Sequence, residues 1–479
     1  MAITEQATWL GSRTVLNATL VLAARVVSRL VALVMVIKLA TFLGPDGYGR
    51  YTTLVAYSAL VSVVADFGLS PLYTREAARD PERLSAFLAT LLSGKLVLAV
   101  AASVILAGAL WTAGLGGLIV PGAALLVLTS YATVLRNTFY ARGRLEFEAI
   151  AILCEIAIQF SLILVGARIG AAVGFFVWAY AASFGFTCAY CLVVVRAFRL
   201  GRIKLGFDAR LFRSWLGLAF PFALGAFLTN LYFRADVPIL SHFKPFQEVG
   251  WYQFAYKPFE ALQFVPLAVQ AAVYPLLGVY HKQAGPRLGI AYERFFKVLV
   301  LLGWPLTVGT FVLVHPIGRL FRLFPQSEPS LRILSLGIVF LFANSAFTAM
   351  LYAIDRQDLF AWTTAVGVIV NVCLNLALIP LYGYLAASAI TVVTEAAISV
   401  AGWFFVARRH RLPWLRLSWR IVLAGLILGA ALVPLAGSSI VIAAPLGALV
   451  YAAALWLLRA VHREELDLLL RGLRLRRAS

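Results

Sequence analysis

The apolar residues of this chain occur in about fourteen separate runs, each long enough to cross a bilayer, with short and mostly basic connections between them. Roughly 20 apolar residues form one spanning helix, and no soluble core needs such runs repeatedly. Hydrophobic residues make up 62% of the 479 residues and charged residues only 13%, which leaves too little polar surface for a soluble protein of this length. The sequence therefore predicts an all-α integral membrane protein.

The expected spans follow one another with few residues between them. They cover residues 15–42, 48–71, 86–112, 117–139, 147–166, 170–195, 214–235, 251–280, 295–315, 331–352, 359–380, 384–407, 418–435 and 440–459. Residues 1–12 are polar and lack the basic start, short apolar core and cleavage site of a signal peptide. We therefore expect the first spanning helix to be retained in the mature protein.

The formal net charge of +20 is explained by topology. If the N-terminus lies inside, most of the 41 Lys and Arg residues fall in cytoplasmic connections. The opposite side then holds only Arg50, Arg168, Lys244, Arg319, Arg322 and Arg332. The positive-inside rule predicts this orientation, with both termini cytoplasmic. A nucleic-acid partner is not needed to account for the charge.

A few basic residues fall within the spans, where a central charge costs at least a few kcal/mol unless it is paired, hydrated or able to reach the interface. Lys38, Lys95 and Arg136 lie near span ends and are expected to snorkel. Arg25 and Arg29 differ, because they lie four residues apart on one face of the first helix, deep in an apolar run.

Two later spans carry polar residues at the same helical spacing. These are Asn230 and Arg234, followed by Asp236, and then Gln253, Lys257 and Glu260 on a helix that Pro258 and Pro266 are expected to kink. One interpretation is a wet cavity shared by the first, seventh and eighth spans. The other is a set of buried ion pairs, with Arg25 or Arg29 pairing with Asp66 and Arg234 with Asp236.

Weak internal repetition relates the two halves of the chain. Tyr140, Ala141, Arg144 and Ala149 match Tyr352, Ala353, Arg356 and Ala361 at one constant separation, and Leu39, Phe42, Gly49 and Tyr51 match Leu240, Phe243, Gly250 and Tyr252 at another. This order predicts two pseudo-symmetric six-helix bundles, residues 1–200 and 201–411, with a transport site between them. Residues 412–479 would add two helices and a basic cytoplasmic tail.

Several segments resemble the polysaccharide flippases of the multidrug/oligosaccharidyl-lipid/polysaccharide (MOP) exporter superfamily. The resemblance lies in Asn17 and the arginines of the first helix, residues 43–51 (LGPDGYGRY), residues 66–69 (DFGL), residues 74–76 (TRE), residues 248–252 (EVGWY) and residues 257–260 (KPFE). It implies a flippase of the bacterial inner membrane. Such a protein moves polyprenyl-diphosphate-linked oligosaccharide to the outer leaflet by alternating access, and its partners are that substrate, membrane lipids and the enzymes of glycan assembly.

A diphosphate cargo suits arginine, which offers a fixed fork of donors and a permanent charge. The expected diphosphate residues are Arg25, Arg29, Arg234 and Lys257. The expected glycan residues are Asn230, Tyr252, Gln253, Asn344, Asn371 and Asn375, although Asn371 and Asn375 share a helix face and would also suit helix packing. Coupling to H⁺ or Na⁺ has as its candidates Asp66, Glu155, Asp236, Glu260 and Glu395.

Sequence signals of catalysis are absent. Gly94 and Lys95 lack the other residues of a P-loop, the five histidines show no metal-ligand spacing, and Cys188 and Cys191 lie in an apolar run that favours packing. We therefore expect a transporter without a cofactor, apart from a coupling ion. The alternatives are a multidrug exporter of the same superfamily and a membrane-embedded glycan polymerase or ligase.

Overall fold

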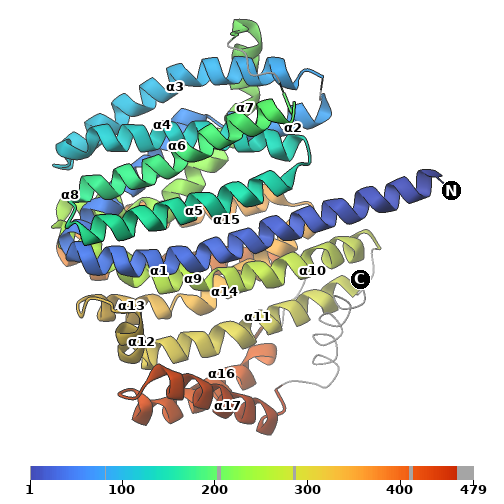
Figure 1. Ribbon diagram of the computed structural model, residues 1–479. Coiled ribbons are helices and arrows are strands. Elements are labelled where there is room, and N and C mark those ends of the chain that lie inside the picture. Colours follow the sequence, from blue (N-terminus) through green and yellow to red (C-terminus); the bar gives the residue numbers. More distant parts are fainter. Residues whose placement is uncertain (1, 81, 202–205, 284–286, 409–413, 461–479) are drawn as a thin grey trace. The chain divides into compact units, whose positions relative to one another are not determined.

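The computed structural model describes residues 2–80, 82–201, 206–283, 287–408 and 414–460, and these residues form helices and turns with no strand among them. The chain divides into two compact units, Met1–Gly250 and Trp251–Ser479. Figure 1 labels most of their helices. The first unit contains α1 (Ala2–Asp66), α2 (Leu69–Arg79), α3 (Leu84–Thr112), η1 (Gly116–Leu118), α4 (Ile119–Ala141), α5 (Leu145–Arg168), α6 (Val173–Ala197), α7 (Ala209–Arg234) and α8 (Asp236–Phe243). Helix α9 (Phe246–Leu262) begins in this unit and continues into the second.

The second unit contains the remaining helices. They are α10 (Phe264–Lys282), α11 (Arg287–Val312), α12 (Val314–Phe321), α13 (Ser327–Ser335), α14 (Ile338–Ala353), α15 (Gln357–Ala407), α16 (Trp414–Leu432), η2 (Val433–Leu435) and α17 (Ile440–Leu457). The expected boundary between two six-helix bundles near residue 200 stays a prediction. Helix α7, which follows that boundary, packs against α1, α2 and α3 within the first unit.

The expected all-helical membrane fold is confirmed. In the described part of the chain, 11 helices are long and apolar enough to cross a membrane, or 12 if α13 and α14, bent by 42°, form one span. Two of these candidates, Thr19–Asp66 with 48 residues and Gln357–Ala407 with 51, are far longer than the roughly 20 residues that one crossing needs. Each contains a glycine with positive φ, Gly44 at 67° and Gly383 at 61°, where the backbone leaves the helix. These breaks fall between the spans expected on either side, and the exact number of crossings stays a prediction.

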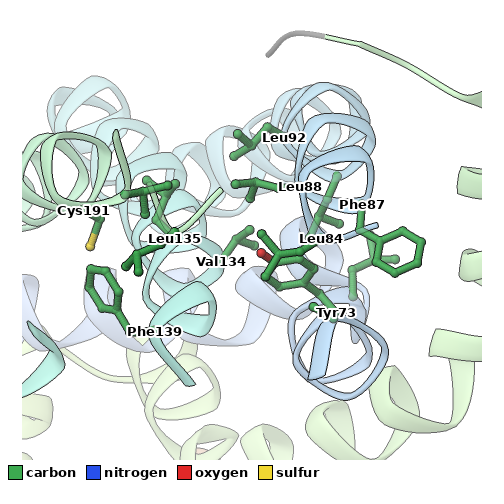
Figure 2. Packing of buried hydrophobic residues seen from close by; sticks show 14 of the residues in the cluster. Tyr73, Leu84, Phe87, Leu88, Leu92, Val134, Leu135, Phe139 and Cys191 are labelled. Carbon is green, nitrogen blue, oxygen red and sulfur yellow. The ribbon is translucent and has the colours of Figure 1, made fainter. Parts of the chain in front are cut away.

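The core of the first unit lies among α2, α3, α4 and α6. Figure 2 shows Tyr73, Phe87, Val134, Phe139 and Cys191 converging between these helices. Van der Waals packing must hold them together, because lipid tails are as apolar as the side chains themselves. The Tyr73 hydroxyl is satisfied by a 3.0 Å hydrogen bond with Thr138. Cys191 is buried in this core and Cys188 packs against it, which fits the packing role expected of these two cysteines.

Helix α11 holds α16 and α17 through side chains that reach backbone carbonyls. The Trp304 indole donates to the carbonyl of Val422 at 3.2 Å, and the Tyr451 hydroxyl donates to that of Leu301 at 3.1 Å. Gly425 makes the first approach possible, because a Cβ at this position would lie 2.1 Å from the indole nitrogen. The two C-terminal helices therefore pack as part of the second unit.

The repeat in the sequence has two local counterparts in the structure. The turn before α5 and the turn before α15 share one geometry, with a positive-φ residue, Gly143 or Asp355, followed by an arginine that pairs with an acidic residue two positions later. The arginine in each turn is the matched residue of the repeat, Arg144 or Arg356. This agreement supports the internal repeat at these turns.

The second counterpart is a reciprocal backbone crossing inside the first unit. A Cβ on Gly49 would lie 1.8 Å from the carbonyl oxygen of Phe246, and a Cβ on Gly250 would lie 2.0 Å from that of Pro45. Gly49 matches Gly250 in the repeat, and Pro45 lies as far before Gly49 as Phe246 lies before Gly250. Only glycine permits both approaches.

Replacing Gly49 or Gly250 by alanine should therefore destabilise the protein. The added methyl group meets backbone rather than a flexible side chain, so we expect a loss of about 1–3 kcal/mol or more in the free energy of unfolding. Thermal denaturation in detergent, followed by the loss of the monodisperse peak in size-exclusion chromatography, measures the effect. Gly108→Ala in α3 is the control, because nothing lies within 4 Å of its added Cβ. Equal melting temperatures for all three variants would contradict the crossing.

Candidate functional site: charged residues within the spans of the first unit

Arg25 and Arg29 lie on the same exposed face of α1, as their spacing predicts. Arg25 Nη2 donates a 2.8 Å hydrogen bond to the hydroxyl of Tyr140 on α4. Arg29 has no hydrogen-bond or ion-pair partner among the described residues. The expected alternative in which Asp66 pairs with either arginine is wrong, because Asp66 bonds elsewhere. A permanent charge that lies exposed in a span and lacks a protein partner is suited to an anionic ligand.

Arg234 ends α7 in the same unit and is half-buried. It lies within electrostatic range of Tyr180 on α6. Asp236, the partner expected in the ion-pair interpretation, is 5% exposed and accepts a 2.9 Å hydrogen bond from the backbone of Val237 at the start of α8. Asn230, one turn before Arg234, donates to the carbonyl of Ala226 at 2.9 Å.

Lys95 does not snorkel as its position near a span end suggested. Its side chain is completely buried, and its ammonium donates to Asp66 at 2.6 Å and to the carbonyl of Ser130 at 3.3 Å. The position of Lys95 near the end of an apolar run gives no sign of this pair, because α3 extends from Leu84 and places Lys95 in the packed part of the unit.

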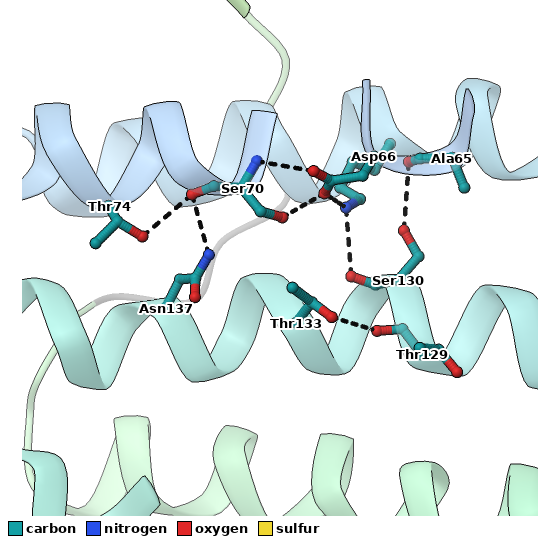
Figure 3. A network of polar contacts seen from close by, with 9 residues as sticks. Ala65, Asp66, Ser70, Thr74, Thr129, Ser130, Thr133 and Asn137 are labelled. Carbon is teal, nitrogen blue, oxygen red and sulfur yellow. Dashed lines mark hydrogen bonds and ion pairs between the residues drawn. The ribbon is translucent and has the colours of Figure 1, made fainter. Parts of the chain in front are cut away.

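Asp66 is the last residue of α1, directly before the break at Phe67 and Gly68, which both adopt positive φ. Its carboxylate accepts hydrogen bonds from the hydroxyl and the backbone N–H of Ser70, at the start of α2 (Figure 3). A carboxylate is stabilised there by the orphan N–H groups and the positive end of the helix. Asn137 on α4 donates to the carbonyl of Ser70 at 3.0 Å, so the segment of residues 66–70 is tied to α4 as well as to α3.

Arg136 also departs from the expected snorkelling. It lies on α4 with its side chain 17% exposed, and it meets two carboxylates of α5, Glu155 at 2.5 Å and Glu148 at 3.7 Å. Thr187 on α6 donates to Glu155 at 2.7 Å. Glu148 is not among the expected site residues, although its spacing of two helical turns from Glu155 places both on one face of α5.

The candidate residues of the second unit are mostly engaged. Lys257 forms a 2.8 Å ion pair with Glu260 one turn later on α9, as their spacing predicts. Tyr252 is fully buried, and its hydroxyl lies 3.1 Å from that of Thr391. Gln253 is half-buried on the same helix. The kink expected in residues 251–280 is a break in the helix: α9 ends at Leu262 and α10 begins at Phe264, so the break falls at Gln263, between Pro258 and Pro266.

A second polar cluster joins α14 to α15. Asn344 donates to the carboxylate of Glu395 at 2.7 Å, and Asn375 donates to Asn371 at 2.9 Å. Asn371 and Asn375 are both buried, and the amide oxygen of Asn375 has no hydrogen-bond partner within the described structure. These contacts fit helix packing. No group of three or more His, Cys, Asp or Glu side chains suited to a metal ion occurs among the described residues.

Comparisons with known proteins agree with this architecture. A family model described as "Polysaccharide biosynthesis protein" matches residues 15–281, and a model described as "MatE" matches residues 221–377. No curated protein matches the chain.

Solved structures share the fold at low sequence identity. A lipid II flippase, MurJ, in an inward closed conformation superposes with a TM-score of 0.74 at 16% identity, covering 91% of this chain and 98% of its own. An inward-facing multidrug resistance transporter of the MATE family, in the MOP superfamily, gives 0.62 at 14% identity, covering 80% and 94%. The MATE multidrug transporter DinF-BH gives 0.56 at 14% identity, covering 84% and 96%.

Proposed function

Because the chain belongs to the polysaccharide biosynthesis protein family and has the fold of MOP-superfamily transporters, we propose that it is a flippase for oligosaccharides carried on a polyprenyl diphosphate. The cargo would pass from the cytoplasmic to the outer leaflet of a bacterial inner membrane by alternating access, with both termini of the protein in the cytoplasm. The observation that carries the proposal is the exposed arginine pair of α1, in which Arg29 has no partner among the described residues.

The diphosphate would bind to Arg25, Arg29 and Arg234, with Lys257 as a further contact. Guanidinium groups bind phosphate oxygens in bidentate fashion and stay charged at every physiological pH, so they suit a cargo that always carries negative charge. The sugar would contact amide and aromatic groups such as Asn230, Gln253 and Asn344, and the prenyl tail would remain in the bilayer. MurJ, which shares the fold, is described as a flippase for lipid II.

Energy would come from the membrane potential or from an H⁺ or Na⁺ gradient. Of the five candidate coupling residues, Asp66, Glu155 and Glu260 already have basic partners. Asp236 and Glu395 are buried, at 5% and 4% exposed. Contact with glycan assembly enzymes is part of the same proposal.

A multidrug exporter is the second candidate function, because the MatE model matches residues 221–377. Organic cations would require a net acidic site, whereas the exposed charged residues in the described part of α1, Arg25, Arg29 and Lys38, are all basic. The polymerase alternative is set aside, because the matching family and the proteins that share the fold are transporters.

Vesicles that contain the purified chain test the proposal directly. A fluorescent oligosaccharide on a polyprenyl diphosphate is placed in both leaflets, and a membrane-impermeant quencher reports how fast the inner-leaflet pool becomes accessible. We expect exchange between leaflets in protein-containing vesicles, no exchange in empty ones and no new glycosidic bond in the recovered lipid. Transport of a fluorescent organic cation without exchange of the lipid would overturn the proposal in favour of the exporter.

A further inference from the structure

Glu148 is a buried carboxylate one turn into α5 that none of the expected roles includes. It is 3% exposed, and one of its oxygens, Oε2, has no hydrogen-bond partner within the described structure. A carboxylate in this position is costly unless positive charge or hydrogen bonds compensate it. The question is which cation supplies that compensation.

Arg136 is the nearer cation, but its charge is shared. Its guanidinium lies 2.5 Å from Glu155, which has a hydrogen bond from Thr187 in addition, and 3.7 Å from Glu148. One guanidinium therefore faces two carboxylates. Glu148 has the poorer geometry of the two, so its negative charge is only partly neutralised by Arg136.

The second cation is Arg25, and Tyr140 connects the two groups. Arg25 Nη2 donates to the Tyr140 hydroxyl at 2.8 Å, and that hydroxyl donates to Glu148 Oε1 at 3.4 Å. The donors follow one another from Arg25 through Tyr140 to Glu148, so the negative charge of Glu148 holds the arginine in its present position. The direction of this hydrogen-bond chain is fixed, because arginine is only a donor and the carboxylate only an acceptor.

We propose that Glu148 is a positioning residue that competes, through Tyr140, with the anionic headgroup of the cargo for Arg25. This proposal rests on the diphosphate role of Arg25 in the proposed function. While Arg25 is drawn toward Tyr140, it binds the diphosphate less tightly than a free guanidinium would. Glu148 thereby keeps the affinity low enough for the cargo to be released after translocation.

Glu148→Gln should therefore bind the headgroup more tightly, which is the opposite of what loss of a structural residue would cause. Glutamine keeps the shape and the hydrogen-bond acceptor but removes the charge. We expect a fall in Kd of roughly five- to a hundredfold, the range typical of coupling between two interacting sites. Tyr140→Phe, which removes the connecting hydroxyl, should lower Kd in the same direction.

The probe is farnesyl diphosphate, titrated into the full chain in nanodiscs, with farnesol to measure binding of the tail alone. Glu146→Gln is the matched control, because Glu146 lies on the same helix and pairs with Arg144 instead. In an Arg25→Ala background, Glu148→Gln should have no effect, since the competition needs the arginine. Slower lipid exchange in vesicles despite the tighter binding is the expected functional counterpart.

The outcomes separate the two proposals. If Arg25→Ala and Arg29→Ala bind the probe as the unmodified chain does, the diphosphate site itself is overturned. If those variants lose affinity while folded Glu148→Gln and Tyr140→Phe bind no more tightly than the unmodified chain, the role of Glu148 is overturned and the site stands. A gain in affinity that persists without Arg25 would also overturn it.

Discussion

Lys95→Met is expected to lower the free energy of unfolding by about 3 kcal/mol, at the lower end of the range for breaking a buried ion pair. The substitution keeps the length of the side chain but leaves the carboxylate of Asp66 without its cation inside a helical bundle. The lower end applies because the side chain of Asp66 is 26% exposed and keeps its hydrogen bonds from Ser70. Melting temperature and the yield of monodisperse protein in detergent measure the loss.

Two further variants show whether the loss comes from the ion pair. Lys38→Met removes an exposed lysine of α1 and should leave stability unchanged. Neutralising both partners, in Lys95→Met with Asp66→Asn, should recover part of the lost stability, because no uncompensated charge remains. If Lys95→Met melts at the same temperature as Lys38→Met, the pair contributes nothing to stability.

The membrane fold was predictable because lipid imposes it. An apolar run of about 20 residues must become a helix in the bilayer, since no water is present to satisfy the backbone. Gly44 and Gly383 fell between expected spans for the same reason: the apolar run ends there. The short helices α2, α8 and α12 were not expected, because their lengths of 8 to 11 residues give no spanning signal.

The partners of the buried charges were not predictable, because helical spacing fixes which face a residue occupies but not which helix lies opposite. Lys95 and Arg136 appeared to lie near span ends, and only the packing of α3, α4 and α5 shows that each meets a carboxylate. For the contacts of Arg136, the sequence signal is the seven-residue spacing of Glu148 and Glu155, which places both carboxylates on one face of α5. The expected pairing of Asp66 with an arginine of α1 is wrong because the sequence does not show that α3, which carries Lys95, lies beside Asp66.

Alanine substitution of Arg25, Arg29 or Arg234 should weaken binding of the diphosphate headgroup by roughly ten- to a hundredfold. Each change removes charge-assisted hydrogen bonds of about 1.5–3 kcal/mol, and every 1.4 kcal/mol corresponds to a factor of about ten. Lysine at the same position should restore only part of the affinity, because it lacks the bidentate fork. Titration with farnesyl diphosphate and lipid exchange in vesicles measure the two consequences, and Arg168→Ala, an exposed arginine at the end of α5, is the control.

Arg29 separates a binding role from a structural one most cleanly. Arg25 is bonded to Tyr140, so its removal changes packing as well as charge, whereas Arg29 has no partner among the described residues whose loss could unfold the protein. Normal yield and melting temperature together with lost transport in Arg29→Ala would therefore identify a site. Normal transport in both Arg29→Ala and Arg234→Ala would exclude these arginines from binding the headgroup of the cargo. The exposed charge on α1 would then be explained by contact with the headgroups of membrane lipids.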